Sequence, residues 1–224
     1  MSAPPRREAG HVLVRTGRLD LRPVSPDDTD ALHPILGDPG NSRFLPGGAL
    51  ASPGDTRDWL ERFGVSWAEH GLGYWTVRRR ADGTVIGVGG AEWRPGFWNL
   101  LYFLGRDHWG HGYATELARA ARHAARSRDP GLPLAAWIHE QNTASQAVAR
   151  RLGLRDRGLR EASHWKHWTG EPMHYWVADA PASDPPASDA PASAASARRR
   201  RAPRTTSGLV VAQNGGSEAR RKSP

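Results

Sequence analysis

The 224-residue sequence contains no cysteine and no long apolar run. The lack of cysteine excludes disulfides, thiolate chemistry and zinc sites with cysteine ligands. No apolar run approaches the roughly 20 residues that a membrane span needs. The first twenty residues, MSAPPRREAGHVLVRTGRLD, lack the apolar core of a signal peptide. We therefore expect a cytoplasmic protein without a membrane segment.

The net charge of +8 is spread unevenly along the chain. Residues 180–224 carry eight Lys and Arg against three Asp and Glu, a net charge of +5. This segment is rich in Ala, Pro and Ser, so it cannot bury enough apolar surface to offset its chain entropy. We expect a folded domain over 1–179 and a disordered tail over 180–224. The basic run at 198–204 is interpreted as part of a solvated tail, with nucleic-acid association as the alternative.

The folded part alternates strand-like and helix-like segments. Ser25 followed by Pro26 is typical of a helix start, and Asp82-Gly83 is typical of a hairpin turn. The run FWNLLYFLG (97–105) is almost wholly apolar, which predicts a strand buried on both faces. Strands are expected within 11–24, 73–93 (two, joined at the turn), 97–105, 132–140 and 171–180, and helices over 25–36, 55–70, 112–128 and 142–153.

The stretch RDHWGHGYATELARAA (106–121) joins a buried strand to a long helix. Two glycines there, Gly110 and Gly112, permit a tight turn and a close approach of a ligand to the backbone. The free N–H groups and positive dipole end of a helix start favour an anion such as pyrophosphate. Neither the Walker A pattern nor the G-x-G-x-x-G dinucleotide pattern fits, since Thr115 takes the place of the third glycine. The same dinucleotide pattern fails at GVGGAE, which begins at Gly87.

The histidines of this stretch raise the alternative of a metal site. His108 and His111 are three residues apart, as are His164 and His167. A zinc site without cysteine needs further histidine or carboxylate ligands, and ten histidines in one chain make such pairs a matter of chance. We expect no metal site.

The arginines on the helix that follows are interpreted as a solvated face, with electrostatic attraction of an anionic ligand as the alternative. They are Arg119, Arg122, Arg126 and Arg128.

A second motif, NTASQAVARRLGL, lies about thirty residues further along. Asn142 follows a strand and precedes a helix, so helix capping alone explains it. Ser145 falls in the first turn, and Gly153 is a helix stop. Taken singly, these features do not indicate a function.

Together the segments resemble the GCN5-related N-acetyltransferase (GNAT) superfamily, in particular its ribosomal-protein-alanine-acetyltransferase-like (RimJ/RimL-like) branch. Three ordered stretches carry the resemblance, which spans roughly residues 13–178. They are RTGRLDLRPVSPDDTDALHPILGDPGNSRFLP, YFLGRDHWGHGYATE and NTASQAVARRLGL.

The resemblance implies an α+β (α/β) fold. Its mixed, mostly antiparallel sheet would have six to seven strands, splay apart at strands 4 and 5, and carry helices on both faces. Acetyl-CoA would lie in the opening. Its pantetheine would pair with the strand end Phe103, Leu104 and Gly105. The turn and helix start would bind its pyrophosphate through Trp109, Gly110, His111, Gly112, Tyr113, Ala114 and Thr115, and Asn142 would complete the cofactor set.

The implied reaction is direct acetyl transfer to a primary amine of a protein N-terminus or a small molecule. Many relatives carry a tyrosine acid seven residues after the asparagine, where this chain has Ala149, so Ser145 is the candidate acid. A strand carboxylate is replaced by Asn99, which leaves Glu92 as the candidate base. The alternatives for Glu92 are a solvated strand-end carboxylate and base catalysis through water.

Two further departures widen the alternatives. Asp107 stands where the wider superfamily often has Arg or Gln, which removes one phosphate donor. The missing tyrosine and strand carboxylate also keep open a catalytically silent acyl-CoA sensor. We expect a monomer or homodimer.

The tryptophans in segments that could line the acceptor cleft are interpreted mostly as core, with an aromatic wall for the amine as the alternative. They are Trp93, Trp98, Trp165 and Trp168.

Overall fold

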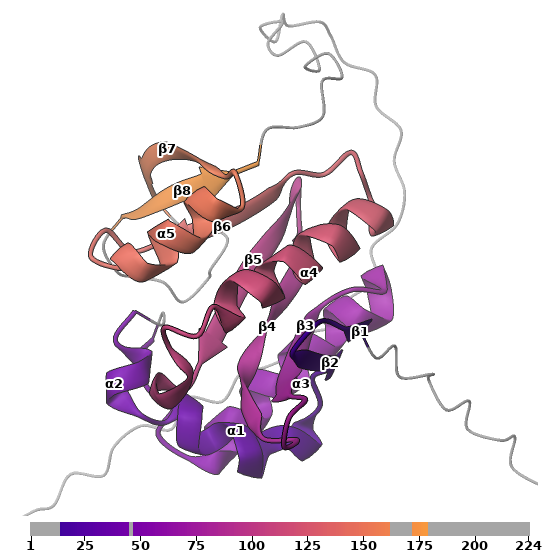
Figure 1. Cartoon of the computed structure of the whole chain (residues 1–224), viewed down its shortest axis with the longest axis vertical. Helices are drawn as coiled ribbons and strands as arrows, with labels where there is room; N and C mark the ends of the chain where they lie inside the picture. Colours follow the sequence, from indigo (N-terminus) through magenta and orange to yellow (C-terminus); the bar gives the residue numbers. More distant parts are fainter. Residues whose placement is uncertain (1–13, 45–46, 162–171, 179–224) are drawn as a thin grey trace, which may run out of the picture. The chain divides into compact units, whose positions relative to one another are not determined.

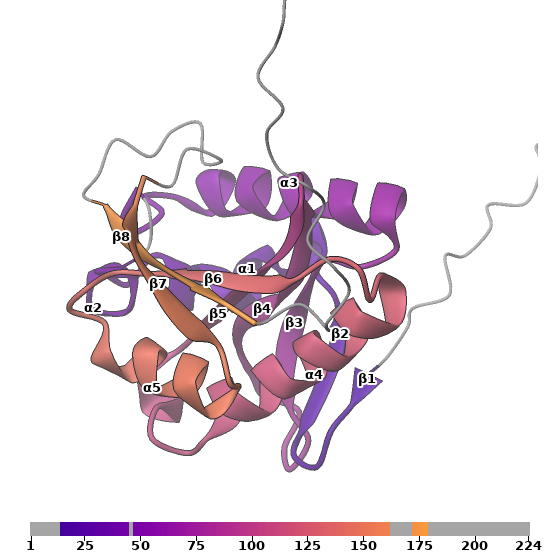
Figure 2. The same cartoon turned by 90° about the horizontal axis from the view of Figure 1, so that it is seen from above.

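The computed structural model describes residues 14–44, 47–161 and 172–178. These residues fold around a central sheet with helices on both faces (Figures 1 and 2). Some predicted features lie outside the described residues: the tail 180–224 with its basic run, and the segment with His164, Trp165, His167 and Trp168. No described helix is both long and apolar enough to cross a bilayer.

Over the described residues, the sheet has eight strands in the order β1-β2-β3-β4-β5-β6-β8-β7. Every neighbouring pair is antiparallel except β5 and β6, which run parallel. The mixed, mostly antiparallel sheet is thus confirmed. The strands are β1 (Val14–Arg15), β2 (Leu19–Pro23), β3 (Tyr74–Arg79), β4 (Val85–Arg94), β5 (Phe97–Leu104), β6 (Leu134–Ile138), β7 (Arg155–Arg160) and β8 (Met173–Val177).

Two layers of helices cover the sheet, α1 and α3 on one face and α4 and α5 on the other (Figure 2). Leu32 and Leu60 pack with Val88 in the first core, and Leu117 and Val148 belong to the second. The helices are η1 (Pro26–Asp28), α1 (Thr29–Leu36), α2 (Pro39–Ser42), α3 (Pro53–His70), η2 (Arg106–His108), α4 (Tyr113–Arg128) and α5 (Thr143–Arg151).

The helix start predicted at Ser25 rests on local chemistry and is confirmed, whereas the helix expected from residue 55 begins two residues earlier, at Pro53. The Ser25 hydroxyl accepts a hydrogen bond from the backbone N–H of Asp27, and Pro26 occupies the first helical position. Asp28 completes the capping box, because its carboxylate accepts from the backbone N–H of Ser25. The hairpin at Asp82-Gly83 also forms, with Gly83 at φ +73°.

The sheet has more than six or seven strands for two reasons. The segment expected as one extended strand near residue 20 folds back as a hairpin of β1 and β2. Strand β7 was not predicted, because its sequence RDRGLR has no apolar alternation and all six residues are exposed. Its pairing with β8 holds it at the sheet edge, where charged side chains are common.

The prediction that 97–105 is buried on both faces holds only in part for the second half of the strand. Trp98, Asn99 and Leu100 are buried, but Leu101, Tyr102 and Phe103 are only partly buried. These three residues line a cavity and also pack against the hydrophobic core, Tyr102 on one face of the sheet and Leu101 and Phe103 on the other. The apolar character of this half therefore serves both the core and the cavity wall.

The glycines of GVGGAE in β4 allow a close approach to β5. A Cβ atom at Gly87 would lie 2.1 Å from the carbonyl oxygen of Phe103, and one at Gly89 would lie 2.6 Å from that of Leu101. Real Cβ atoms do not tolerate such distances. These glycines position the half of β5 that lines the cavity, which accounts for a glycine-rich stretch with no phosphate pattern.

Candidate functional site

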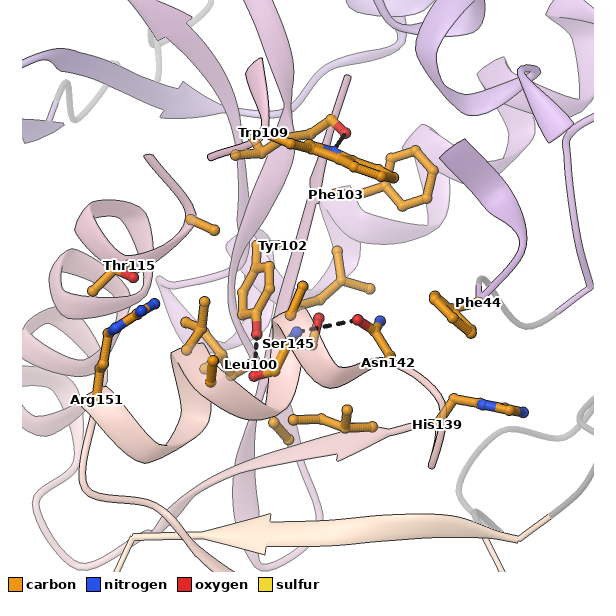
Figure 3. Close-up of a pocket in the computed structure, with 18 of the residues that line it drawn as sticks. Phe44, Leu100, Tyr102, Phe103, Trp109, Thr115, His139, Asn142, Ser145 and Arg151 are labelled. Atoms are coloured by element: carbon orange, nitrogen blue, oxygen red, sulfur yellow. Dashed lines mark hydrogen bonds between the residues drawn. The ribbon is translucent and has the colours of Figure 1, made fainter. Parts of the chain in front are cut away.

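The site lies where β5 and β6 separate. Their parallel pairing covers only Trp98 with Leu134 and Asn99 with Ala135, after which β6 diverges from β5 on the side of α5 (Figure 1). A cavity of about 760 Å³ occupies the opening. This volume lies within the range of small-molecule sites. Its walls come from the second half of β5, the turn before α4, the starts of α4 and α5, and β6 (Figure 3).

The backbone of β5 presents an open edge to this cavity. The Trp98 N–H donates to the Pro133 carbonyl just before the opening, so the backbone groups of Trp98 face β6. Backbone groups of alternate residues in a strand point to the same edge. The Leu100 carbonyl and the backbone groups of Tyr102 therefore face the opening beyond the last β5–β6 pair, and the Leu104 carbonyl there accepts from the Trp109 indole at 2.7 Å.

The turn before α4 exposes backbone N–H groups to the same cavity. Gly110 and Gly112 have φ values of +77° and +80°, in the left-handed region that favours glycine. Gly112 caps α4 without a side chain, whereas Ser52 caps α3 and Asn142 caps α5 through their side chains. The first N–H groups of α4 have no partner within the helix. The positive end of a 16-residue helix is thus left available for an anion.

An arginine from the first hairpin fixes the shape of this turn. The Arg18 guanidinium donates to the carboxylate of Glu116 at 2.8 Å and to the carbonyl oxygen of His111 at 2.8 Å. It also lies over the ring of Tyr113, 4.6 Å from the centroid. Burial alone would raise the pKa of Glu116, but hydrogen bonds from Thr16 and Arg18 lower it overall. Glu116 therefore stays ionised at neutral pH and holds Arg18 against the turn.

The start of α5 forms the opposite wall. The Asn142 side chain accepts from the backbone N–H of Ser145 at 3.1 Å, which is a helix-capping bond. The Tyr102 hydroxyl donates to the Ser145 carbonyl at 3.1 Å, so β5 and α5 are joined across the cavity (Figure 3). Burial raises the pKa of Tyr102 to about 12, and its hydrogen bond with Ser145 acts in the opposite direction. Tyr102 is thus a neutral hydrogen-bond donor at physiological pH.

Behind the wall, a buried polar cluster contains Glu92. Its side chain forms an ion pair with Arg94 at 2.7 Å, and its residue is only 5% exposed. Desolvation raises the pKa of Glu92, while Arg94 and the Tyr74 hydroxyl act to lower it. The same Tyr74 hydroxyl accepts from the Asn99 side-chain amide at 2.7 Å. Asn99 lines the cavity and Glu92 does not, so the carboxylate lies one layer behind the wall.

Comparison with known proteins places this geometry in a family. The model of the acetyltransferase (GNAT) domain family matches residues 18–155, more than half of the chain. The chain belongs to the GNAT acetyltransferase family.

Individual relatives are distant in sequence. YkkB, an uncharacterized protein of Bacillus subtilis (strain 168), is 28% identical over 144 residues, which are 62% of this chain and 83% of YkkB. An acetyltransferase from Agrobacterium tumefaciens str. C58 is 26% identical with a TM-score of 0.62, covering 79% of this chain and 95% of its own. The ribosomal-protein-S5-alanine acetyltransferase of Vibrio fischeri is 16% identical with a TM-score of 0.62, covering 78% and 100%, and shares the fold.

Most residues that the GNAT resemblance implied line the cavity. Those that do are Phe103, Leu104, Trp109, Gly110, Gly112, Ala114, Thr115, Asn142 and Ser145. Gly105 lies instead in a neighbouring pocket with Asp107. Tyr113 is buried, and its ring stacks on His111 at 5.8 Å; neither is part of the cavity wall. The contribution expected from His111 and Tyr113 therefore reduces to their backbone N–H groups.

The environment of Glu92 differs from the two that were expected, a base that faces the acceptor and a solvated carboxylate at a strand end. It is not a solvated strand-end carboxylate, since it is buried and paired with Arg94. It also does not face the cavity directly. A role as base requires a water molecule or a shift of Asn99 to connect it with the acceptor.

Several residues of the cavity wall are not predicted from the sequence, because they come from segments that are distant along the chain. Arg18 and Tyr102 lie far in sequence from their partners at Glu116 and Ser145. At the end of the cavity away from α4, Phe44 contacts His139 with ring centroids 5.2 Å apart (Figure 3). Arg18, Phe44 and Tyr102 lie within the stretches that carry the GNAT resemblance, but the resemblance assigns them no role. The apolar run at 101–103 is compatible with a core strand and does not reveal the cavity by itself.

The remaining expectations concern metals and tryptophans. Within the described residues, no group of three or more His, Asp or Glu side chains is arranged to hold a metal ion. Trp98 is buried in the core, and Trp93 stacks on His70 at 4.2 Å. Neither lines the cavity. These two residues therefore form no aromatic wall in this cavity.

Proposed function

We propose that the protein is an acetyl-CoA-dependent N-acetyltransferase that transfers the acetyl group directly to a primary amine. The observation that carries the proposal is the cavity between β5 and β6, with an anion-binding turn at its α4 side and an open backbone edge on β5. The N–H groups around Gly110 and Gly112 would bind the pyrophosphate. The backbone of Leu100 and Tyr102 would pair with the pantetheine. Membership of the GNAT family supports acetyl transfer.

The reaction needs five events at the thioester. A base takes a proton from the ammonium, the neutral amine nitrogen attacks the acetyl carbon, the nitrogen of the tetrahedral intermediate gives a second proton to the base or to solvent, the C–S bond breaks, and the thiolate of CoA takes a proton. The oxyanion of the tetrahedral intermediate is stabilised by a backbone N–H on the open edge of β5. Ser145 lies on the opposite wall, supplies the proton to the thiolate and regains one from solvent. Tyr102 holds Ser145 in place through its hydrogen bond to the Ser145 carbonyl.

The acceptor remains a class rather than a compound. One structural relative acts on an alanine of a ribosomal protein, and the resemblance of this chain points to the same branch. A protein N-terminus and a small-molecule amine both provide a primary amine whose nitrogen becomes the nucleophile once it is deprotonated. The proposal therefore covers both, in a protein that is a monomer or a homodimer and needs no metal ion.

Two measurements test the proposed function. Acetyl-CoA should raise the melting temperature of the full chain, since a ligand that binds only the folded state stabilises it. Acetyl-CoA consumption should then appear with at least one member of a panel of N-terminal peptides, polyamines and aminoglycoside-like amines. Stabilisation without turnover on any amine would favour the alternative of an acyl-CoA sensor. No stabilisation at millimolar acetyl-CoA would contradict both.

Removal of the Ser145 hydroxyl tests the proposed acid. Ser145→Ala should lower kcat by about 100-fold, the lower end of general acid–base contributions, with little change in the affinity for acetyl-CoA. The matched control is Thr143→Ala, because Thr143 is an exposed hydroxyl residue in the same helical turn and lies outside the cavity wall. Steady-state kinetics and acetyl-CoA melts on both variants separate the two roles. An unchanged kcat in Ser145→Ala would rule out this acid.

A further inference from the structure

Two arginines stand at the end of the cavity between α4 and α5. Arg119 lies one helical turn after Thr115 on α4, and Arg151 lies in the last turn of α5; both line the cavity. In Figure 3, the guanidinium of Arg151 extends toward Thr115. The two helices are tied at this point, since Arg122 donates to the carbonyl oxygen of Leu152 at 2.5 Å. The fold thus brings two positive charges from separate helices to one rim.

These two guanidinium groups differ from their neighbours in having no partner among the described residues. Arg18 is neutralised by Glu116, while Arg122 and Arg128 donate to backbone carbonyls of Leu152 and His70. For Arg119 and Arg151, the described part of the chain contains no hydrogen-bond acceptor and no ion-pair partner. The described wall residues of the cavity also include no Asp or Glu. The rim is therefore a site of uncompensated positive charge.

The position of the pair relative to the turn indicates which anion it meets. Arg119 is seven residues beyond Gly112, which corresponds to about 10 Å of helix rise. The backbone N–H groups at Gly110–Gly112 suffice for the pyrophosphate without a side-chain charge. CoA carries one more phosphate, on the 3′ oxygen of its ribose, joined to the pyrophosphate through that sugar. Paired arginines are the side chains best suited to a phosphate dianion.

We propose that Arg119 and Arg151 form a subsite for the 3′-phosphate of CoA and make the enzyme select CoA over dephospho-CoA. This inference rests on the proposed function, because it assumes that acetyl-CoA occupies the cavity. Among the arginines of α4, the proposal gives only Arg119 a role in attracting an anionic ligand. Arg122 and Arg128 serve the fold, and Arg126 lies outside the cavity wall.

A comparison of two ligands on three variants tests the subsite. The ligands are acetyl-CoA and acetyl-dephospho-CoA, which differ only in the 3′-phosphate. The variants are Arg119→Gln, Arg151→Gln and the control Arg126→Gln, an exposed arginine on α4 outside the cavity wall. Dissociation constants come from melts or calorimetry on the full chain, and a melt without ligand checks that each variant folds.

The wild-type protein should bind acetyl-dephospho-CoA about tenfold or more weakly than acetyl-CoA, as expected for loss of hydrogen bonds to a charged group. Each cavity variant should weaken acetyl-CoA binding about five- to tenfold and leave acetyl-dephospho-CoA binding unchanged, so the phosphate and the arginines are coupled. Arg126→Gln should change neither constant. Equal weakening of both ligands, or equal wild-type affinity for both, overturns the subsite. Absence of binding by either ligand instead contradicts the proposed function.

Discussion

Replacing Gly110 with leucine should abolish the stabilisation of the protein by acetyl-CoA while leaving the free protein folded. A Cβ atom at Gly110 meets nothing within 4 Å, so a side chain there makes no clash with the protein. It projects instead from a turn that lines the cavity, where the pyrophosphate must approach the backbone. The φ of +77° adds strain of about 1–2 kcal/mol for a residue with a Cβ.

The expected size of the effect is large. Acetyl-CoA at 100 times its Kd contributes about 2.7 kcal/mol to the wild-type protein, which raises Tm by roughly 5–10 °C for a chain of this size. Gly110→Leu should remove this rise. The matched control is Gly83→Leu, since Gly83 has a φ of +73° with its nearest neighbour atom at 3.9 Å, and lies in the hairpin turn away from the cavity wall. A Gly110→Leu protein that keeps its full ligand-induced rise would contradict the phosphate role of the turn.

The elements that the sequence predicts correctly are those fixed by local chemistry. Ser25 and Asn142 cap helices in the way their types and positions indicate, and the Asp82-Gly83 hairpin forms. Strand β7 shows the limit of this approach. Its six exposed residues carry no periodic signal, and only pairing with β8 makes them a strand. The four-residue helix α2 was missed for a similar reason, since it is too short to show a helical period.

In the candidate site, too, the parts formed by one continuous stretch can be predicted and the parts formed by tertiary contacts cannot. The turn from Trp109 to Gly112 can be predicted because a continuous stretch of sequence provides it. The Arg18 clamp cannot be, because Glu116 lies 98 residues away and only the packing of the first hairpin against α4 brings them together. The burial of Glu92 is another tertiary effect. Its place in the sequence indicates a strand end, whereas the fold buries it beside Tyr74 and its cross-strand partner Asn99.

The position of Glu92 suggests how this chain manages without a carboxylate on β5. Glu92 and Asn99 are direct cross-strand partners in the β4–β5 pair, and the Tyr74 hydroxyl joins their side chains. A carboxylate is therefore present one strand away from the position of Asn99. Burial provides what a base near neutral pH requires, because desolvation raises the pKa of Glu92 toward the working pH. If Glu92 is the base, a water molecule must connect it with the amine, because Glu92 does not line the cavity.

Glu92→Gln should lower kcat/KM by about 100-fold or more if Glu92 is the base. Glutamine keeps the size of the side chain and an oxygen for Arg94, so the cluster should stay folded. A base must be deprotonated to act, so wild-type kcat/KM should fall as pH drops through the pKa of Glu92, which burial raises above its ordinary value. The variant should lose this fall in rate at low pH, the acidic limb of the pH–rate profile, and pH–rate profiles of both proteins would measure it.

The protonation of the acceptor amine also produces an acidic limb, and two comparisons separate it from that of Glu92. Acceptors with different amine pKa values move a limb caused by the amine and leave a limb caused by the protein in place. Asn99→Asp, introduced into Glu92→Gln, puts a carboxylate directly on the cavity wall and should restore part of the rate without an intervening water. If Glu92→Gln changes neither the rate nor the limb, the amine reaches the thioester already neutral and Glu92 serves only to hold Tyr74 and Asn99 in place.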